Sequence, residues 1–173
     1  GVATGDFDND GWVDLYVTNF GPGQLLRNLG GETFTDVSRS AGIENHREFG
    51  VSAAFVDYDR DGWLDLYVAN NVDYDLEDRT ECPNMAGSRD YCPPQTHGGT
   101  QDRLYRNRGD GTFEDVNETA LQHTVEIGVA RTEGGRLGPA LGVATADYDG
   151  DGWPDIYVAN DGSENLLWVN QQD

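Results

Sequence analysis

Short runs in which hydrophobic and polar residues alternate recur along this chain of 173 residues, and they are rich in aromatic and β-branched side chains. Such runs favour strands that are buried on one face, because successive side chains of a strand point to opposite sides. The runs lie at residues 1–4, 15–17, 51–56, 66–68, 142–146 and 156–158. The pattern predicts three pairs of strands, each joined by a short connection.

A second pattern lies between these pairs and predicts two further strands. Residues 26–37 and 105–116 share the order of an apolar run, Arg-Asn, a turn and a second apolar run. The turns contain Gly30-Gly31 and Asp110-Gly111, which are tight-turn signals of a hairpin. Residues 165–170 begin the same hairpin a third time. Each complete unit therefore has about four strands.

Repeated four-stranded units of roughly 50 residues are typical of β-propeller blades. We therefore predict an all-β fold of four-stranded antiparallel blades in a partial or open propeller, forming a single repeat domain over residues 1–173. Asp6 and Asp57 are 51 residues apart, but Asp57 and Asp147 are 90 apart, so the second unit carries 39 extra residues. The predicted units are about 1–50, 51–141 and 142–173, with a long insertion at about 72–100 and a shorter one at about 123–139.

The connection inside each strand pair carries the sequence Asp-x-Asp-x-Asp-Gly-x-x-Asp. Carboxylates about 5 Å apart repel each other by roughly 3 kcal/mol at an effective dielectric constant near 20, so a cation is expected among them. Alternate aspartates converge when the loop curls, the glycine permits the sharp turn, and the tryptophan after it offers a main-chain carbonyl. The predicted ligands are Asp6, Asp8, Asp10, Trp12 and Asp14; Asp57, Asp59, Asp61, Trp63 and Asp65; and Asp147, Asp149, Asp151, Trp153 and Asp155.

These ligands predict calcium, with about three ions in all. Every donor is an oxygen atom, which disfavours zinc, copper and iron, and a flexible anionic loop suits calcium better than magnesium. An EF-hand would need glutamate at position twelve and flanking helices, whereas this position is Val17, Val68 or Val158 within a strand-like run. An acidic, solvated turn without an ion is the alternative for each single copy.

The same residues resemble a known family. The stretches 57–70 and 102–113, together with Cys92-Pro93-Pro94, are similar to FG-GAP/VCBS repeat proteins and, within them, to the ASPIC/UnbV (cartilage acidic protein-like) group. The resemblance implies propeller blades, calcium in each loop and an extracellular or periplasmic setting, but no reaction. Members of the family have about seven blades, so we expect either a portion of a longer polypeptide or open sheet edges that neighbouring copies complete. Unpaired edges favour self-association into an oligomer or filament.

Composition narrows the choice of partners and compartment. The chain has 32 Asp and Glu against 11 Lys and Arg, a net charge of −21 and no basic patch, which disfavours nucleic acid. No segment is long and apolar enough to span a membrane. Cys82 and Cys92 lie ten positions apart in the long insertion, and we predict a disulfide, which suits an oxidising compartment. Two free thiols or half of a metal site are the alternatives.

Weaker signals concern glycosylation, adhesion and catalysis. Asn117-Glu118-Thr119 is a glycosylation sequon predicted on a surface turn, and Arg108-Gly109-Asp110 spells an adhesion tripeptide inside a hairpin turn. The three histidines belong to no repeated element, and no nucleophile motif accompanies them, so we expect no enzyme activity. We predict a non-catalytic extracellular scaffold or interaction module. A calcium-dependent glycan-binding or adhesion module, with glycans or extracellular proteins as partners, is the alternative, and an enzyme accessory domain is less favoured.

Overall fold

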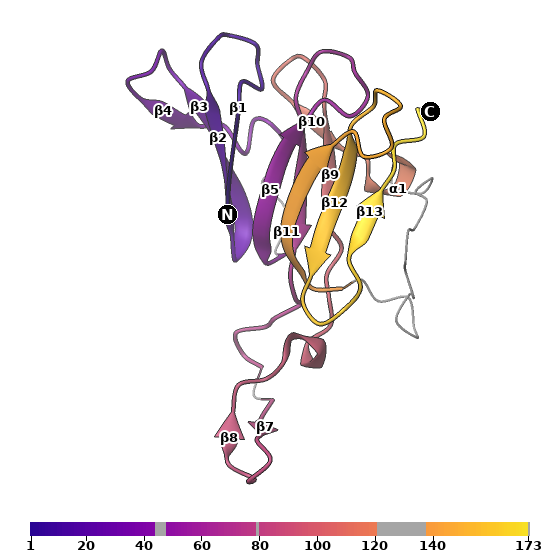
Figure 1. Cartoon of the computed structure of the whole chain (residues 1–173). Helices are drawn as coiled ribbons and strands as arrows, with labels where there is room; N and C mark the ends of the chain where they lie inside the picture. Colours follow the sequence, from indigo (N-terminus) through magenta and orange to yellow (C-terminus); the bar gives the residue numbers. More distant parts are fainter. Residues whose placement is uncertain (44–47, 79, 121–137, 173) are drawn as a thin grey trace.

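A computed structural model describes residues 1–43, 48–78, 80–120 and 138–172, and its main elements are three antiparallel sheets side by side (Figure 1). The first sheet has the order β1-β2-β3-β4, with β1 at Val2–Gly5, β2 at Asp14–Asn19, β3 at Gly21–Asn28 and β4 at Phe34–Asp36. The second has the order β5-β6-β9-β10, with β5 at Gly50–Val56, β6 at Asp65–Asn70, β9 at Arg103–Asn107 and β10 at Phe113–Asp115. The third contains β11 at Ala140–Ala146, β12 at Asp155–Asn160 and β13 at Leu166–Trp168. The all-β prediction and the predicted strand pairs are confirmed.

The remaining elements belong to the insertions. The long insertion contains the two-stranded ribbon of β7 at Cys82–Pro83 and β8 at Arg89–Asp90, followed by a 3-10 turn, η1, at Pro94–Thr96. A disulfide joins Cys82 to Cys92, as predicted. A short helix, α1 at Asn117–Ala120, follows β10. Most of the shorter predicted insertion, at about 123–139, lies outside the described residues.

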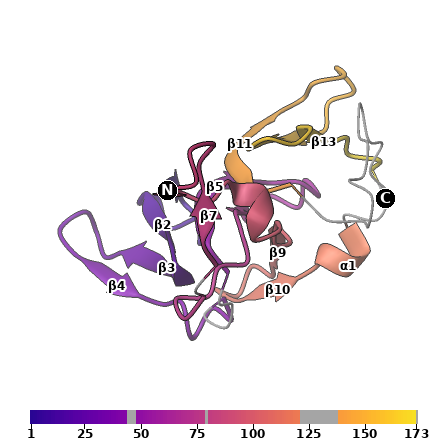
Figure 2. The same ribbon diagram turned by 90° about the horizontal axis from the view of Figure 1, so that it is seen from below.

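The three sheets share one orientation. Their first strands β1, β5 and β11 lie next to one another, and Figure 2 shows β5 near the middle with β4 and β10 farther out. All three connections between first and second strands lie at one end of the molecule, whereas the long insertion extends from the other end (Figure 1). The repeated acidic motif is therefore presented three times on the same end.

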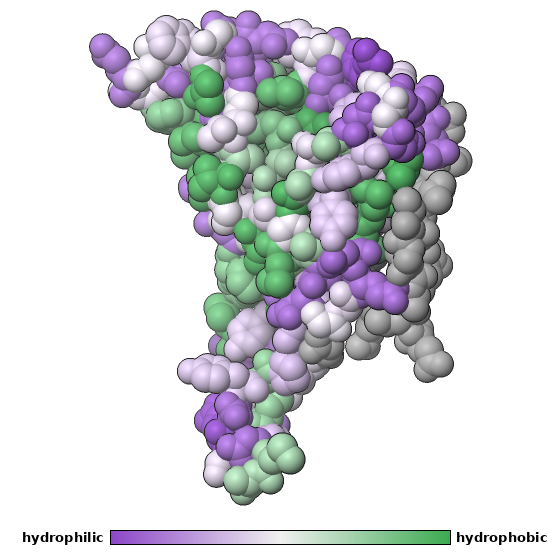
Figure 3. Space-filling model, in the orientation of Figure 1, coloured by the Kyte–Doolittle hydropathy of each residue, from purple (hydrophilic) through white to green (hydrophobic). Residues whose placement is uncertain are grey.

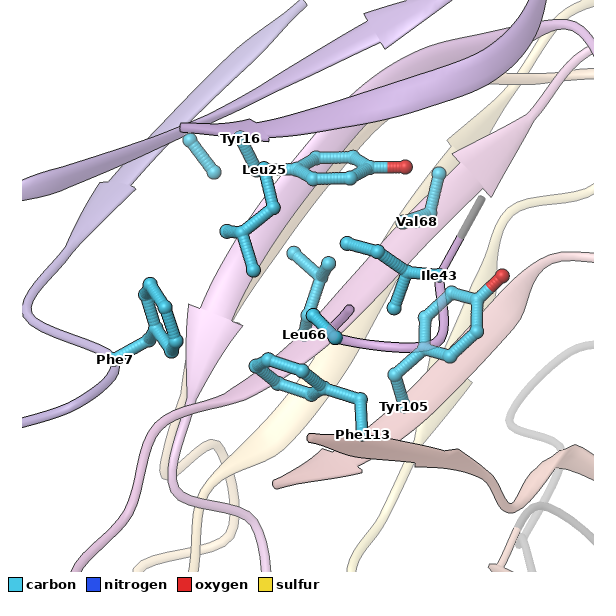
Figure 4. Packing of buried hydrophobic residues seen from close by; sticks show 10 residues of the cluster. Phe7, Tyr16, Leu25, Ile43, Leu66, Val68, Tyr105 and Phe113 are labelled. Atoms are coloured by element: carbon cyan, nitrogen blue, oxygen red, sulfur yellow. The ribbon is translucent and has the colours of Figure 1, made fainter. Parts of the chain in front are cut away.

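Two hydrophobic layers hold the sheets together. The layer between the first and second sheets contains Phe7, Tyr16, Leu25, Ile43, Leu66, Val68, Tyr105 and Phe113 (Figure 4). The layer between the second and third sheets contains Val56, Tyr67, Ala69, Leu104, Ala140, Ile156 and Val158. Leu66 and Tyr67 are neighbours in β6 and enter different layers, because alternate side chains of a strand point to opposite faces. The second sheet is consequently buried on both sides, and all six residues of β6 are buried.

The third sheet contains three strands among the described residues, and β13 is its open edge. An open edge offers unpaired backbone groups to another strand. The self-association expected from the sequence remains a prediction.

Candidate metal centres

The three acidic loops connect β1 to β2, β5 to β6 and β11 to β12. Figure 3 shows hydrophilic residues gathered at the end of the molecule that carries these loops. Because strands of the same kind flank each loop, the fold presents the same motif in the same way in every sheet.

Side-chain oxygens of three carboxylates approach one another in every loop. One oxygen from each member lies within 4.8 Å of the others in the groups Asp6, Asp8 and Asp10; Asp57, Asp59 and Asp61; and Asp147, Asp149 and Asp155. In the second loop, Asp57 Oδ1 is buried and has no hydrogen-bond partner among the described residues. Clustered carboxylate oxygens with one unsatisfied buried acceptor fit a hard divalent cation such as calcium.

Main-chain hydrogen bonds hold the loops in this shape. The first aspartate accepts the N–H of the glycine five positions later, with Gly11 at 2.9 Å, Gly62 at 3.1 Å and Gly152 at 2.9 Å. These glycines have φ angles of 90°, 92° and 93°, which an L side chain rarely adopts. The glycine that recurs at this position in all three loops is therefore required by the loop backbone.

The ninth-position aspartate joins each loop to the following hairpin. Asp65 is fully buried, and its two oxygens accept the N–H groups of Tyr58 at 3.0 Å and Asn107 at 2.7 Å. Asp14 and Asp155 make the equivalent pairs of bonds in the other sheets. Burial raises the pKa of Asp65 to about 7, although its two hydrogen bonds act in the opposite direction.

The ninth-position aspartate therefore has a structural role that its position in the motif did not reveal. In the third loop, Asp155 also belongs to the acidic group, whereas in the first two loops the group contains the fifth-position aspartate. Each carboxylate oxygen has two lone pairs, so a bond to a main-chain N–H leaves capacity for a cation.

An arginine of the adjacent hairpin lies against two of the three loops. Arg27 contacts Asp8 at 2.5 Å and Asp10 at 3.2 Å, and Arg106 contacts Asp59 at 2.7 Å. These carboxylates raise the pKa of both guanidinium groups. The corresponding residue of the third sheet is Val169, and there Gln172 Nε2 donates to Asp151 at 2.6 Å. The third loop therefore has no arginine of its own hairpin beside its carboxylates, and Arg60 of the second loop is the cation near Asp151.

A repeated asparagine connects neighbouring loops across the sheets. Asn107 Nδ2 donates to the carbonyl of Phe7 in the first loop at 2.8 Å and to that of Leu64 at 3.0 Å. Asn170 Nδ2 donates in the same way to Tyr58 in the second loop at 2.7 Å. Sequence reasoning missed this function, although the Arg-Asn pair in both complete hairpins was a signal.

The tryptophans at the seventh position pack beside the loops. A Cβ added at Gly31 would lie 2.8 Å from the Trp12 ring, and one at Gly109 would lie 2.8 Å from the Trp63 ring, so each indole lies on a hairpin turn. In the third loop, the Arg60 guanidinium lies 5.2 Å from the centre of the Trp153 ring. These contacts give the indoles a packing role, while the main-chain carbonyls remain the predicted ligands.

The glycosylation signal is placed differently from the sequence prediction. Asn117 is only 4% exposed, its Oδ1 accepts the N–H of Leu104 at 2.5 Å, and its Nδ2 donates to the carbonyl of Asp102. The prediction that Asn117 lies on a surface turn is therefore wrong. Asn117 thus accepts a main-chain N–H of strand β9. In the first sheet, Ser38 Oγ does the same at the equivalent position, where it accepts the N–H of Leu25 in β3. Glycosylation of the folded chain would have to displace the amide from these bonds.

Three sheets of one design, each with an acidic loop between its first two strands, define a repeat protein. Residues 6–68 and 95–158 match the FG-GAP-like repeat family, and together these stretches cover more than half of the chain. The chain belongs to this family. FG-GAP repeats form propeller blades, so the three sheets are blades of an open arrangement.

The chain is also similar to cartilage acidic protein 1 of Xenopus tropicalis, Mus musculus and Homo sapiens. The identity is 34% over 71 residues in each case. The aligned stretch covers 40% of this chain but 11% of each relative, so the chain spans a small part of those proteins. This similarity supports the resemblance to the cartilage acidic protein-like group that the sequence motifs indicate.

Two observations bear on the cellular setting. The described cysteines form the Cys82–Cys92 disulfide, and no free cysteine accompanies them. Within the described parts of the chain, no helix has the length and apolar character needed to cross a membrane.

Proposed function

We propose that this chain is a non-catalytic, calcium-stabilised repeat module of an extracellular protein. The observation that carries the proposal is the same acidic loop in all three blades, each with carboxylate oxygens within 4.8 Å of one another. The FG-GAP family is typically non-catalytic, which supports this proposal.

The residues that would hold calcium are the aspartates of the three clusters, with the seventh-position carbonyls as further oxygen donors. Bound calcium would supply positive charge among groups that otherwise repel one another. At a free calcium concentration ten times the dissociation constant, one site stabilises the folded chain by about 1.4 kcal/mol and three sites by about 4 kcal/mol. This is comparable with a whole domain's stability of about 5 to 15 kcal/mol.

The loops would also transmit this stabilisation between blades. Asn107 and Asn170 each join the loop of one blade to the hairpin of the next, so an ordered loop supports two sheets. Asn9 Nδ2 adds a bond of 3.1 Å to the carbonyl of Gly62. Ion binding is therefore expected to stabilise the stack of blades rather than single loops alone.

An extracellular setting is supported by the disulfide and by the acidic composition. Disulfides persist in oxidising compartments, and a bridge that closes a short loop stabilises it by roughly 2 to 3 kcal/mol. Three calcium ions would change the formal charge from −21 to about −15, which keeps the surface acidic. A role as scaffold or interaction module fits a repeat fold of this kind.

Native mass spectrometry in calcium tests the proposal. We expect three ions bound to the wild-type chain and two bound to Asp57→Ala or to Asp147→Ala, because each substitution removes one cluster. Thr4→Ala, an exposed change outside the loops, is the control and should keep three ions. A wild-type chain that binds no calcium at millimolar concentration would refute the proposal.

A further inference from the structure

The long insertion contains a cleft of about 550 Å³ that the calcium loops do not explain. The insertion that carries it, with β7 and β8, lies at the end of the molecule opposite those loops (Figure 1). Its walls include Tyr74, Asp78, Arg89, Asp90, Tyr91 and His97. A volume of this size falls within the range of roughly 300 to 1,000 Å³ typical of small-ligand sites.

Aromatic rings form the apolar part of the cleft. Tyr91 is 96% exposed and Tyr74 is 40% exposed, so both rings are accessible. The Tyr74 ring is positioned from two sides, because it lies edge-on to His97 at 5.0 Å and to Phe20 of the first blade at 6.2 Å. The cleft therefore combines one ring that is held by its neighbours with a second that projects into solvent.

Polar groups line the rest of the cleft and are oriented by local contacts. Asp78 Oδ2 lies 3.3 Å from His97 Nδ1, and Asp78 Oδ1 accepts the N–H of Thr80 at 2.8 Å. Asp90 Oδ1 accepts the N–H of Tyr91 at 2.8 Å, which leaves Oδ2 of Asp90 available to a ligand. Arg89 adds guanidinium donors on the same ribbon.

The disulfide holds these groups in one place. Cys92 lines the cleft and is bonded to Cys82 of β7, and β7 pairs with β8, which carries Arg89 and Asp90. The disulfide thus joins Cys82, which pairs with Asp90 across the ribbon, to Cys92, which directly follows Tyr91. A ribbon of two residues per strand is too short to be stable by itself, so the disulfide is needed to hold β7 and β8 together.

We propose that this cleft binds a neutral oligosaccharide. A sugar ring offers an apolar C–H face that can stack on tyrosine and a rim of hydroxyl groups that pair with carboxylates and guanidinium donors. Arg89 disfavours a cationic ligand, whereas Asp78 and Asp90 disfavour an anionic one. The proposal goes beyond calcium binding, because none of the cleft residues belongs to an acidic loop.

The test is a glycan array of neutral and acidic oligosaccharides, followed by titration calorimetry of the wild-type chain with the neutral tri- and tetrasaccharides that bind on it. We expect Tyr91→Ala and Asp90→Asn each to weaken binding by about tenfold or more, since aromatic anchors dominate such sites. Met85→Ala is the matched control, because Met85 is fully exposed in the same insertion and does not line the cleft. It should bind as the wild type does.

Three results would overturn the proposal: no neutral oligosaccharide bound, binding of acidic glycans alone, or unchanged binding by Tyr91→Ala. Asp57→Ala separates this proposal from the calcium function, since it should lose one ion while it keeps the affinity for the oligosaccharide. Loss of saccharide binding in Asp57→Ala would contradict an independent site at the opposite end of the molecule.

Discussion

The substitution Asp102→Asn should stabilise the folded chain at neutral pH. Asp102 is buried in the second blade, where it accepts the Tyr67 hydroxyl at 2.8 Å and the N–H of Asn70 at 2.7 Å. Burial raises its pKa from 3.8 to about 7, although both hydrogen bonds favour the ionised form. The third blade already has asparagine at this position, and Asn165 makes the same two contacts with Asn160 and Tyr157.

The sign of the pH dependence follows from the raised pKa. The folded chain keeps a proton on Asp102 at pH values where the unfolded chain has lost it, so stability falls as pH rises from about 4 to about 7. A shift of roughly three pKa units, at about 1.4 kcal/mol per unit, limits the cost of ionisation to about 4 kcal/mol. Asparagine removes this cost, because it is neutral and fits both contacts, with its amide donating to the Tyr67 hydroxyl.

Urea unfolding of both chains at pH 5 and pH 8, in saturating calcium, measures the effect. We expect the unfolding free energy of Asp102→Asn, relative to that of the wild type, to increase by about 2 to 3 kcal/mol from pH 5 to pH 8, since other groups titrate equally in both chains. The reasoning would be refuted if the two chains showed parallel pH dependence, or if Asp102→Asn were less stable than the wild type at pH 8.

Two further predictions concern the hairpin residues beside the loops. Arg106→Gln removes a competing cation from Asp59 and should raise the calcium affinity of the second loop. We expect an increase of about two- to fivefold in titration calorimetry, because the ion pair is partly exposed. A weaker affinity would show that the arginine supports the site. Asn107→Ala leaves two carbonyls of neighbouring blades without a donor and should lower the unfolding free energy by about 2 to 4 kcal/mol. Asn28→Ala removes bonds within its own blade only, from Nδ2 to the carbonyl of Val13 and from the N–H of Gly31 to Oδ1, and should cost less in the same urea experiment. An equal loss would contradict the role of the link between blades.

The features that the sequence predicted best depend on neighbouring residues. Alternation placed strands such as β2 and β6, and the spacing of aspartates and glycine placed the loops, because both follow from the local backbone. The disulfide was also predictable, since its cysteines are close in the sequence of one insertion.

The features that the sequence did not reveal depend on contacts between distant residues. The link from Asn107 to Phe7 joins residues 100 positions apart, and the buried pair of Tyr67 and Asp102 joins residues 35 positions apart. The surface placement expected for Asn117 failed for the same reason, because its amide is used by a strand of its own sheet. Sequence spacing carries no information on which side chains of different strands or different blades come into contact.

Thermal unfolding in calcium, in magnesium and in excess EDTA tests the central claim most directly. If divalent cations hold the three acidic loops, chelation should lower the melting temperature by about 10 °C or more, and magnesium should restore it poorly. Calcium added back should restore the original value. An identical melting temperature in calcium and in EDTA would contradict the account.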